Sequence, residues 1–169
     1  DCASFMLGTI MAETLKIGIA GCGIGGRAAA LYLSRAGHSV EIFDQFSAPK
    51  PVGSGLVIQP VGLAVLRELG LAEATLSRGH KIYKMYGTEA DNGRGVLNVD
   101  YGPPGGDTFG IGLHRARLVD ALYQALVQSH TTSRHGLEIT ATQRSPGRRK
   151  LISKAGSRYG DLDLVIDAS

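Results

Sequence analysis

Two short apolar runs near the start of the chain flank a glycine-rich turn and a helical pattern. Lys16–Ala20 (KIGIA) is apolar and rich in isoleucine, which is typical of a buried parallel strand. From Gly25 the stretch GRAAALYLSRAG places apolar residues at helical spacing, and Gly37 is suited to end that helix. Residues 38–43 (HSVEIF) predict a second strand. Strand, turn, helix and strand fill about thirty residues, the length of a βαβ unit.

The rest of the chain predicts loops, short strands and one further clear helix. Residues 47–60 are rich in Pro and Gly and predict a loop, while residues 62–71 (GLAVLRELGL) predict a short amphipathic helix. The pattern RARLVDALYQALVQ predicts a helix over residues 115–128. Strand patterns occur at 81–87, 95–101 and 109–113, as a hairpin at 137–144 and 149–156, and as a final buried strand within 161–169.

These elements predict the α/β class, with a parallel sheet and an antiparallel β insertion. No element follows residues 161–169, although a buried parallel strand normally feeds a helix or loop that covers it. We therefore expect the chain to be incomplete at the C-terminus. MAETLK from Met11 has the look of a natural start, so residues 1–14 are interpreted as an N-terminal extension and residues 15–169 as the domain.

Composition and charge favour a small-molecule partner over nucleic acid. The hydrophobic fraction of 43% and the charged fraction of 20% are ordinary for a soluble globular protein, and 169 residues suffice for one domain. The net charge is only +3, and the basic residues gather around Pro146-Gly147 without aromatic residues that stack on bases. A solvated hairpin turn explains this cluster, so we expect no nucleic-acid binding.

The cysteines and the N-terminus give no sign of a metal site, a disulfide or export. Cys2 and Cys22 lie in unrelated contexts, and the five histidines are scattered. No apolar stretch approaches the roughly 18 residues that span a bilayer. The first ten residues lack a basic region typical of a signal peptide. We expect a cytoplasmic protein that does not enter membranes.

The turn after the first strand carries the strongest functional signal. Gly21, Gly23 and Gly26 form G-x-G-x-x-G, which allows a tight turn, close approach of the backbone to a pyrophosphate, and packing of the helix on the strand. Free N–H groups and the positive end of the helix dipole then face the phosphates. Asp44 ends the second strand, where an acid accepts hydrogen bonds from a ribose hydroxyl.

The motif predicts a dinucleotide but does not choose between FAD and NAD(P). An acid at Asp44 suits either adenosine ribose when its 2′-hydroxyl is free. A glycine-rich turn without a ligand, with Asp44 as an ordinary turn residue, remains the alternative. A plain nicotinamide-binding unit would continue with alternating strands and helices, whereas this chain turns to antiparallel patterns.

The N-terminal stretch GIAGCGIGGRAAALYLSRAGHSVEIFDQ resembles that of the single-component FAD monooxygenases related to para-hydroxybenzoate and salicylate hydroxylases. PVGSGLVIQPVGLAVLRELGL, GLHRARLVDALYQAL and DLDLVIDAS resemble later stretches of the same family in the same order. The resemblance covers residues 15–169. It implies a Rossmann-like, three-layer FAD/NAD(P)-binding domain, in which residues 81–112 supply the first strands of a substrate domain.

The resemblance also assigns residues to the cofactor, which would be non-covalent FAD. It places Gly21, Gly23, Ile24, Gly25 and Gly26 on the pyrophosphate. Asp44 would bind the adenosine ribose with Gln45 beside it, and Arg115 would reach the cofactor. Gly53, Gly55 and Val57 would shape the loop near the flavin ring, while His114 would be a structural neighbour. Relatives have Gly-Ala-Asp-Gly where this chain has Asp167-Ala168-Ser169, so Ser169 receives no role.

The implied reaction is hydroxylation of an aromatic or related small molecule. NAD(P)H would reduce FAD, O₂ would form a flavin C4a-hydroperoxide, and no protein residue is expected to act as the catalytic nucleophile. We expect residues 1–169 alone to be inactive, because the resemblance places most of the substrate domain beyond them. A flavin-dependent reductase or halogenase, and a non-catalytic dinucleotide-binding module, remain alternatives. The oligomeric state is not predicted.

Overall fold

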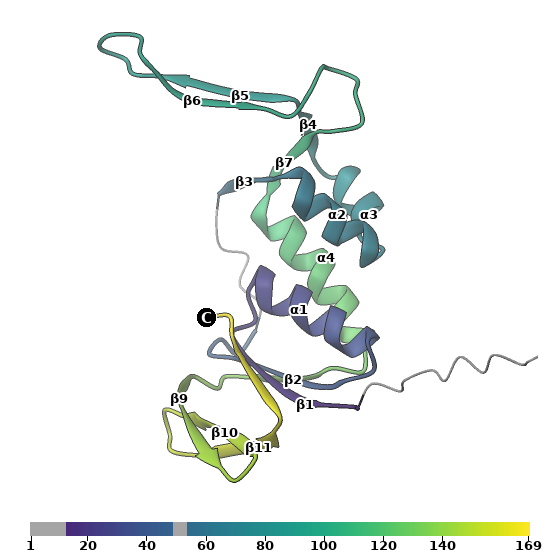
Figure 1. Ribbon diagram of the computed structural model, residues 1–169, viewed down its shortest axis with the longest axis vertical. Coiled ribbons are helices and arrows are strands. Elements are labelled where there is room, and N and C mark those ends of the chain that lie inside the picture. The colour runs from purple at the N-terminus through teal and green to yellow at the C-terminus, as the bar shows by residue number, and fades with distance from the viewer. Residues whose placement is uncertain (1–12, 49–53) are drawn as a thin grey trace, which may run out of the picture.

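A four-stranded parallel sheet forms the centre of the protein in the computed structural model, which describes residues 13–48 and 54–169 (Figure 1). The strand order is β12–β1–β2–β8. The four strands are β1 (Lys16–Ala20), β2 (Ser39–Asp44), β8 (Thr132–His135) and β12 (Leu164–Asp167). Helix α1 (Ile24–Arg35) connects β1 to β2, and the two strands pair in parallel. The predicted βαβ unit is therefore confirmed.

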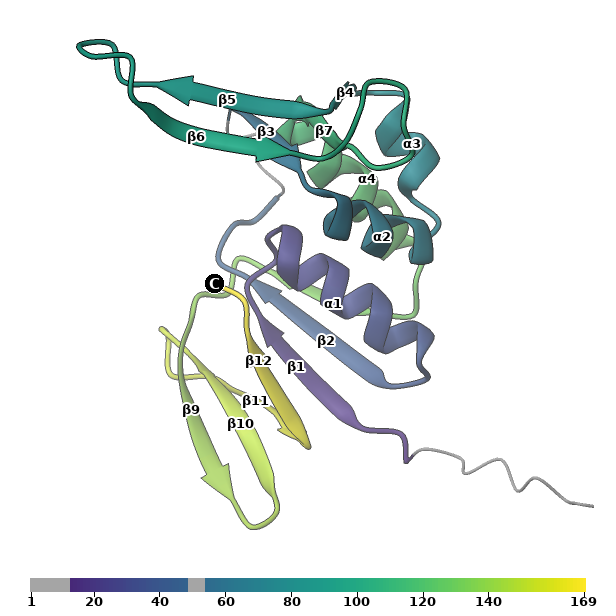
Figure 2. The ribbon, with the colours of Figure 1, turned by 45° about the horizontal axis from the view of Figure 1, so that its top comes forward.

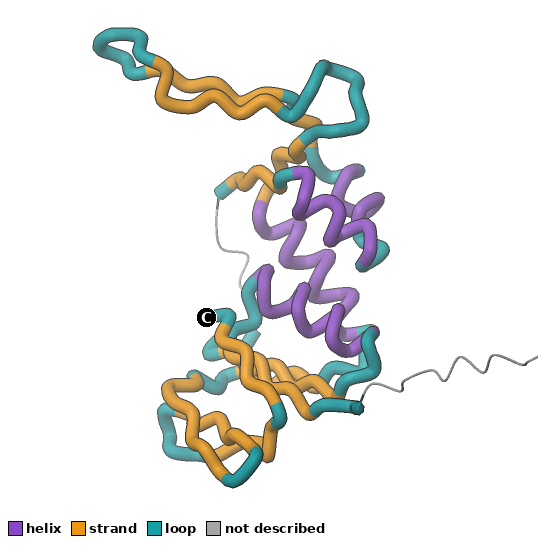
Figure 3. The backbone as a smooth tube through the Cα atoms, in the orientation of Figure 1, coloured by secondary structure: helices purple, strands orange, loops and turns teal. Residues whose placement is uncertain are grey.

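Helices cover one face of this sheet (Figure 2). Helix α1 lies on β2, and α4 (Arg115–Val127) packs along α1. Ile17 and Ile19, on alternate positions of β1, are fully buried in the core that also contains the apolar faces of α1 and α4. The helices, purple in Figure 3, include the short α2 (Pro60–Glu68) and α3 (Ala72–Leu76). These two helices add Leu63, Leu66 and Ala72 to the same core.

An antiparallel sheet covers the opposite face of the parallel sheet. It contains β9 (Ile139–Ser145), β10 (Arg148–Ser153) and β11 (Arg158–Leu162) in the order β11–β10–β9. Phe43, Leu151 and Leu162 form a second buried cluster between the two sheets. Gly18 of β1 faces this cluster, because a Cβ there would lie 2.5 Å from Cδ1 of Leu162. Antiparallel sheet, parallel sheet and helices make the predicted three-layer α/β fold.

A third sheet and a two-stranded ribbon complete the described part of the chain. Strands β3 (Gly55–Ile58), β7 (Gly110–His114) and β4 (His80–Ile82) pair antiparallel in the order β3–β7–β4. Ile111 and Leu113 of β7 join the main core. Strands β5 (Lys84–Thr88) and β6 (Gly95–Asp100) form a ribbon that projects from the body (Figure 2). The ribbon exposes Tyr86, Val96 and Leu97.

Several sequence predictions of local structure were wrong. Within the predicted loop 47–60, residues 55–58 form β3, because β7 supplies a partner that the local pattern does not show. The predicted strand 81–87 is divided between β4 and β5, which belong to different sheets. The predicted helix 62–71 begins earlier, at Pro60, and ends at Glu68. Pro60 fits the first helical position, where no backbone N–H is needed.

Two strands were not predicted, and one predicted burial was wrong. Among the described strands, β8 has the polar sequence TSRH and pairs with β2 alone, and β11 (RYGDL) pairs with β10 alone. Strand β12 was expected to be buried, but it lies at the edge of the described sheet and Leu164 is 41% exposed. Edge strands have one partner and more solvent, so their sequences carry a weaker apolar signal.

Candidate functional site

A cavity of about 760 Å³ opens at the carboxyl ends of β1 and β2, beside the N-terminus of α1. Strand β1 is the point where the sheet order divides, with β2 on one side and β12 on the other. Open α/β sheets bind ligands at such a point. Seven of the predicted site residues line the cavity: Gly21, Gly23, Ile24, Gly25, Asp44, Gln45 and Arg115.

The turn from β1 to α1 uses its glycines for different purposes. Gly21 has φ +103°, and a Cβ there would collide with the carbonyl oxygen of Ala168. A Cβ at Gly26 would collide with the carbonyl oxygen of Gly21, so Gly26 lies beneath the cavity and allows the helix to approach the turn. A Cβ at Gly23 would meet no atom of the described residues within 4 Å. The space in front of Gly23 is therefore open to a ligand.

The N-terminus of α1 presents backbone donors that have no partner among the described residues. The N-cap residue Gly23 has no side chain to bond them, and the first turn contains no acidic residue. The first N–H that reaches back into the turn is that of Arg27, which donates to the oxygen of Gly23 over 3.1 Å. By helix geometry the N–H groups of Ile24, Gly25 and Gly26 precede any intrahelical acceptor. Such groups, with the positive end of the helix dipole, form an anion site.

Asp44 lies at the end of β2 and lines the same cavity. Its Oδ1 accepts a hydrogen bond from the N–H of Phe46 over 2.9 Å, which fixes the carboxylate at the turn. Its Oδ2 has no hydrogen-bond partner among the described residues. The geometry thus leaves one carboxylate oxygen without a partner among the described residues, and the predicted contact of Asp44 with a ribose hydroxyl remains a prediction.

Arg115 and His114 have different roles at the start of α4. His114 is the N-cap, and its Nδ1 accepts the N–H of Ala116 over 3.2 Å, which is the structural role expected for it. The Arg115 side chain is exposed, lines the cavity and forms no ion pair with a described residue. It is therefore available to an anionic or oxygen-rich ligand.

The residues predicted near a flavin ring do not line this cavity. Val57 lies on β3 and is 37% exposed, and Gly55 begins the same strand. Gly53 lies outside the described residues. The predicted contacts of Val57 and Gly55 with a flavin ring remain predictions.

Sequence reasoning missed several residues of the cavity wall. Leu137, Glu138 and Ile139 line the cavity from the segment that follows β8 and enters β9. Strand β8 was not predicted. Ala168 and Ser169 reach the cavity from the end of β12, where the N–H of Ala168 bonds the oxygen of Ala20 over 2.8 Å. Arg27 also lines the cavity. A signal for Arg27 existed, because it is a charged residue one position after the last glycine of the motif.

Two titratable groups near the cavity have shifted pKa values. Burial raises the pKa of the Cys22 thiol, an effect that the neighbouring Arg27 only partly opposes. The N–H and hydroxyl of Ser169 donate to Asp167 and lower the pKa of that carboxyl. Cys22 is therefore a neutral thiol at pH 7, and Asp167 is ionised.

The described residues offer neither a metal centre nor a membrane helix. Across residues 13–48 and 54–169, no three His, Cys, Asp or Glu side chains are placed to hold a metal ion. In the same part of the chain, every helix is too short or too polar to cross a bilayer. The charged side chains that line the cavity are those of Arg27, Arg115, Asp44 and Glu138, and they lie among apolar ones such as Phe43, Val119 and Leu137.

Comparison with known proteins identifies relatives of this arrangement. The chain is 29% identical over 164 residues to salicylate hydroxylase of Pseudomonas putida. The alignment covers 91% of this chain and 36% of the hydroxylase. It is 26% identical over 159 residues to menaquinone reductase of Mycobacterium tuberculosis, covering 91% of this chain and 37% of that protein. The fold is similar to the solved structure of the tetrameric form of 2-methyl-3-hydroxypyridine-5-carboxylic acid oxygenase, with a TM-score of 0.73 and 22% sequence identity. The superposition covers 90% of this chain and 38% of the oxygenase chain.

The chain therefore spans less than half of the length of these relatives. A family model described as "FAD binding domain" matches residues 14–150, which is most of the chain. That match includes the glycine turn, Asp44 and Arg115, and it decides between the two dinucleotides that the motif left open. The chain belongs to the FAD-binding domain family, and its cofactor is FAD.

Proposed function

We propose that this chain is the FAD-binding part of a flavoprotein monooxygenase that uses NAD(P)H and O₂ to hydroxylate a small aromatic molecule. The observation that carries the proposal is the cavity that is lined both by an uncapped helix N-terminus and by Asp44. The likeness to salicylate hydroxylase along almost the whole chain supports the reaction class. A reducing, cytoplasmic location suits NAD(P)H and the unpaired, buried Cys22 thiol.

The residues of the cavity fit the polar parts of FAD. The amides of Ile24, Gly25 and Gly26 would hold the diphosphate, since no side chain occupies their donors. The carboxylate of Asp44 would accept a ribose hydroxyl through Oδ2. Arg115, which also lines the cavity, would bind cofactor oxygens with its fork of donors.

The protein and the cofactor divide the chemistry between them. Bound FAD supplies the redox steps, in which two electrons from NAD(P)H reduce O₂, one oxygen atom enters the substrate and the other leaves as water. The residues of this chain bind and orient the cofactor. The ring of the substrate would be held by parts of the protein beyond the cavity described.

A second candidate function is reduction of a quinone. The likeness to menaquinone reductase extends over as much of the chain as the likeness to salicylate hydroxylase. Both functions need the same FAD site, and they differ in whether oxygen is incorporated. The cofactor site therefore supports the proposal without distinguishing these two reactions.

The test uses the intact protein that contains this chain. FAD binding is measured by fluorescence titration for the wild type, for Asp44→Ala and for the control Asp91→Ala, an exposed acid far along the chain. We expect Asp44→Ala to weaken FAD binding about tenfold, the loss of one charge-assisted hydrogen bond, and Asp91→Ala to leave it unchanged.

The reaction is then followed with NADH or NADPH, a panel of hydroxylated aromatic acids and ¹⁸O₂. Incorporation of ¹⁸O into an aromatic product supports the monooxygenase. Oxidation of NAD(P)H with reduction of a quinone, and no labelled product, would establish the reductase instead. A protein that binds no FAD would refute both.

A further inference from the structure

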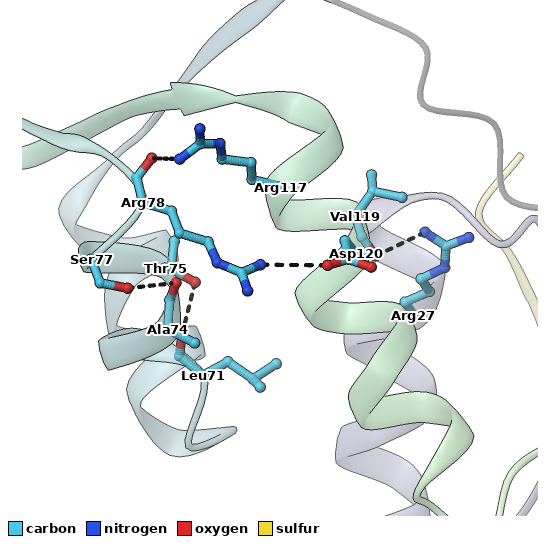
Figure 4. A network of polar contacts seen from close by, with 9 residues as sticks. All are labelled: Arg27, Leu71, Ala74, Thr75, Ser77, Arg78, Arg117, Val119 and Asp120. Carbon is cyan, nitrogen blue, oxygen red and sulfur yellow. Dashed lines mark hydrogen bonds and ion pairs between the residues drawn. The ribbon is translucent and has the colours of Figure 1, made fainter.

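Arg27 is a buried cation in the first turn of α1. The residue is only 2% exposed. Its Nε donates to Sγ of Cys22 over 3.3 Å, and a terminal nitrogen donates to the carbonyl oxygen of Val119 over 3.3 Å. Figure 4 shows the side chain reaching from α1 to Val119 on α4. The guanidinium carbon also lies 5.6 Å from the centroid of the Tyr123 ring.

None of these partners carries a negative charge. A guanidinium keeps its proton in proteins, whereas burial raises the pKa of the Cys22 thiol and keeps it neutral. Asp120 on the facing helix pairs with Arg78 over 3.4 Å (Figure 4), and Asp44 is bonded to the N–H of Phe46. Among the described residues, no carboxylate lies within ion-pair distance of Arg27. A buried charge without a partner is unfavourable.

The position of Arg27 at the start of α1 makes its buried positive charge still less favourable in the ligand-free protein. The first turn of a helix carries about half a positive charge, which repels a cation. Arg27 also lines the cavity, together with Cys22, Gly23 and Gly25 of the turn. An anion in that cavity would supply the missing negative partner of Arg27. It would thereby offset both the cost of burying the charge and the repulsion by the helix dipole.

We infer that Arg27 binds the diphosphate of FAD together with the amides of α1. The inference rests on the proposed FAD site and adds a residue to it. A diphosphate carries about two negative charges, of which the helix N-terminus balances only about half of one. A guanidinium supplies one further positive charge and donors in a fixed fork that suits phosphate oxygens.

A purely structural role is the competing explanation. Arg27 connects α1 to Val119 of α4, so its loss would loosen the helices without affecting phosphate specifically. The two roles predict different results. A structural residue stabilises the ligand-free protein and affects all ligands alike, whereas a phosphate-binding residue affects only ligands that carry phosphate.

The experiment compares ADP, adenosine and FAD by calorimetric titration of the intact, cofactor-free protein. Arg27→Met keeps the length and apolar stem of the side chain but removes the charge. We expect it to weaken ADP and FAD binding about 10- to 100-fold, and adenosine binding less than about twofold. The Tm of the ligand-free variant should equal or exceed that of the wild type, because an uncompensated charge is removed.

Arg35→Met is the matched control. Arg35 lies on the same helix and donates to the carbonyl oxygens of Glu68 and Leu69, away from the cavity. It should lower Tm and leave ADP affinity unchanged. If Arg27→Met does not fold, Arg27→Lys carries the test, with ADP weakened several-fold and adenosine unchanged.

Four results would decide the matter. Unchanged ADP affinity in the folded Arg27 variant would overturn the inference, as would equal weakening of ADP and adenosine with a lower Tm. A wild-type protein that binds neither FAD nor ADP would refute the proposed function itself. Selective loss of ADP and FAD affinity would support Arg27 as a diphosphate-binding residue.

Discussion

At the scale of single residues, Gly18 and Gly23 are glycines for different reasons. A Cβ at Gly18 would lie 2.5 Å from Leu162 and 3.0 Å from Leu151, whereas a Cβ at Gly23 would enter open space. We expect Gly18→Ala to lower the free energy of unfolding by about 1–3 kcal/mol, because the two sheets must move apart. Gly23→Ala should lower it by less than about 1 kcal/mol but weaken FAD binding about tenfold. Urea denaturation and FAD titration measure the two quantities.

Gly87→Ala serves as the control for both variants. A Cβ there would lie at an ordinary 3.4 Å from Leu97 on the projecting ribbon, so stability and FAD affinity should barely change. If Gly23→Ala lost as much stability as Gly18→Ala and kept its FAD affinity, the open space at Gly23 would not be a ligand site.

At the scale of elements, the end of α1 determines how the chain returns to β2. The N–H of His38 bonds the oxygen of Leu33 over 3.1 Å, and the N–H of Gly37 bonds the oxygen of Ser34 over 3.1 Å. Gly37 has φ +89°, as this helix ending requires. We expect Gly37→Ala to lower the free energy of unfolding by about 1 kcal/mol, since an alanine is strained in the left-handed region. Urea denaturation measures this change.

Gly37→Asn provides the comparison for that variant. A Cβ at this position would meet no described atom within 4 Å, so steric crowding is the same for both substitutions. Asparagine tolerates the left-handed region better than alanine, so Gly37→Asn should lower the free energy of unfolding by less than Gly37→Ala does. Equal losses for the two variants would contradict the explanation from backbone conformation.

At the scale of the whole molecule, a small second core holds the antiparallel sheet against the parallel sheet. Leu151 is fully buried in it between Phe43 and Leu162. We expect Leu151→Ala to lower the free energy of unfolding by about 2–5 kcal/mol, because the cavity that it leaves has few neighbours that can fill it. Chemical denaturation of the intact protein measures the loss.

Leu164→Ala is the matched control, since it removes the same atoms from a side chain that is 41% exposed on β12. Its effect should stay below about 1 kcal/mol. A similar loss in both variants would mean that the two sheets are not held together by the cluster around Leu151.

The glycine turn and its surrounding βαβ unit were predictable because their signals are local. The apolar residues of β1, α1 and β2 follow strand or helical spacing within each element. The G-x-G-x-x-G motif and Asp44 lie within the same segment. Helix α4 and the β9–β10 hairpin were predictable for the same reason. Seven of the nine residues predicted to bind the cofactor line one cavity in the structure.

Other features depend on contacts between distant segments. Strand β8 is polar, and it is held at the edge of the sheet by pairing with β2 and by the Arg134–Glu41 ion pair over 3.3 Å. The residues that follow β8 line the cavity, and the N–H of Leu137 bonds the oxygen of Asp44 at the end of β2 over 2.8 Å. The burial of Arg27 likewise depends on α4, which lies about ninety residues further along the chain.

Local sequence is enough to specify the βαβ unit, the glycine turn and the acid at the end of β2, because backbone geometry and side-chain periodicity act over a few residues. Long-range packing sets which edge strands pair, which residues close the cavity and that Arg27 is buried with no acidic partner among the described residues. Those features arise when segments far apart in the chain exclude water from one another, and no local pattern records them.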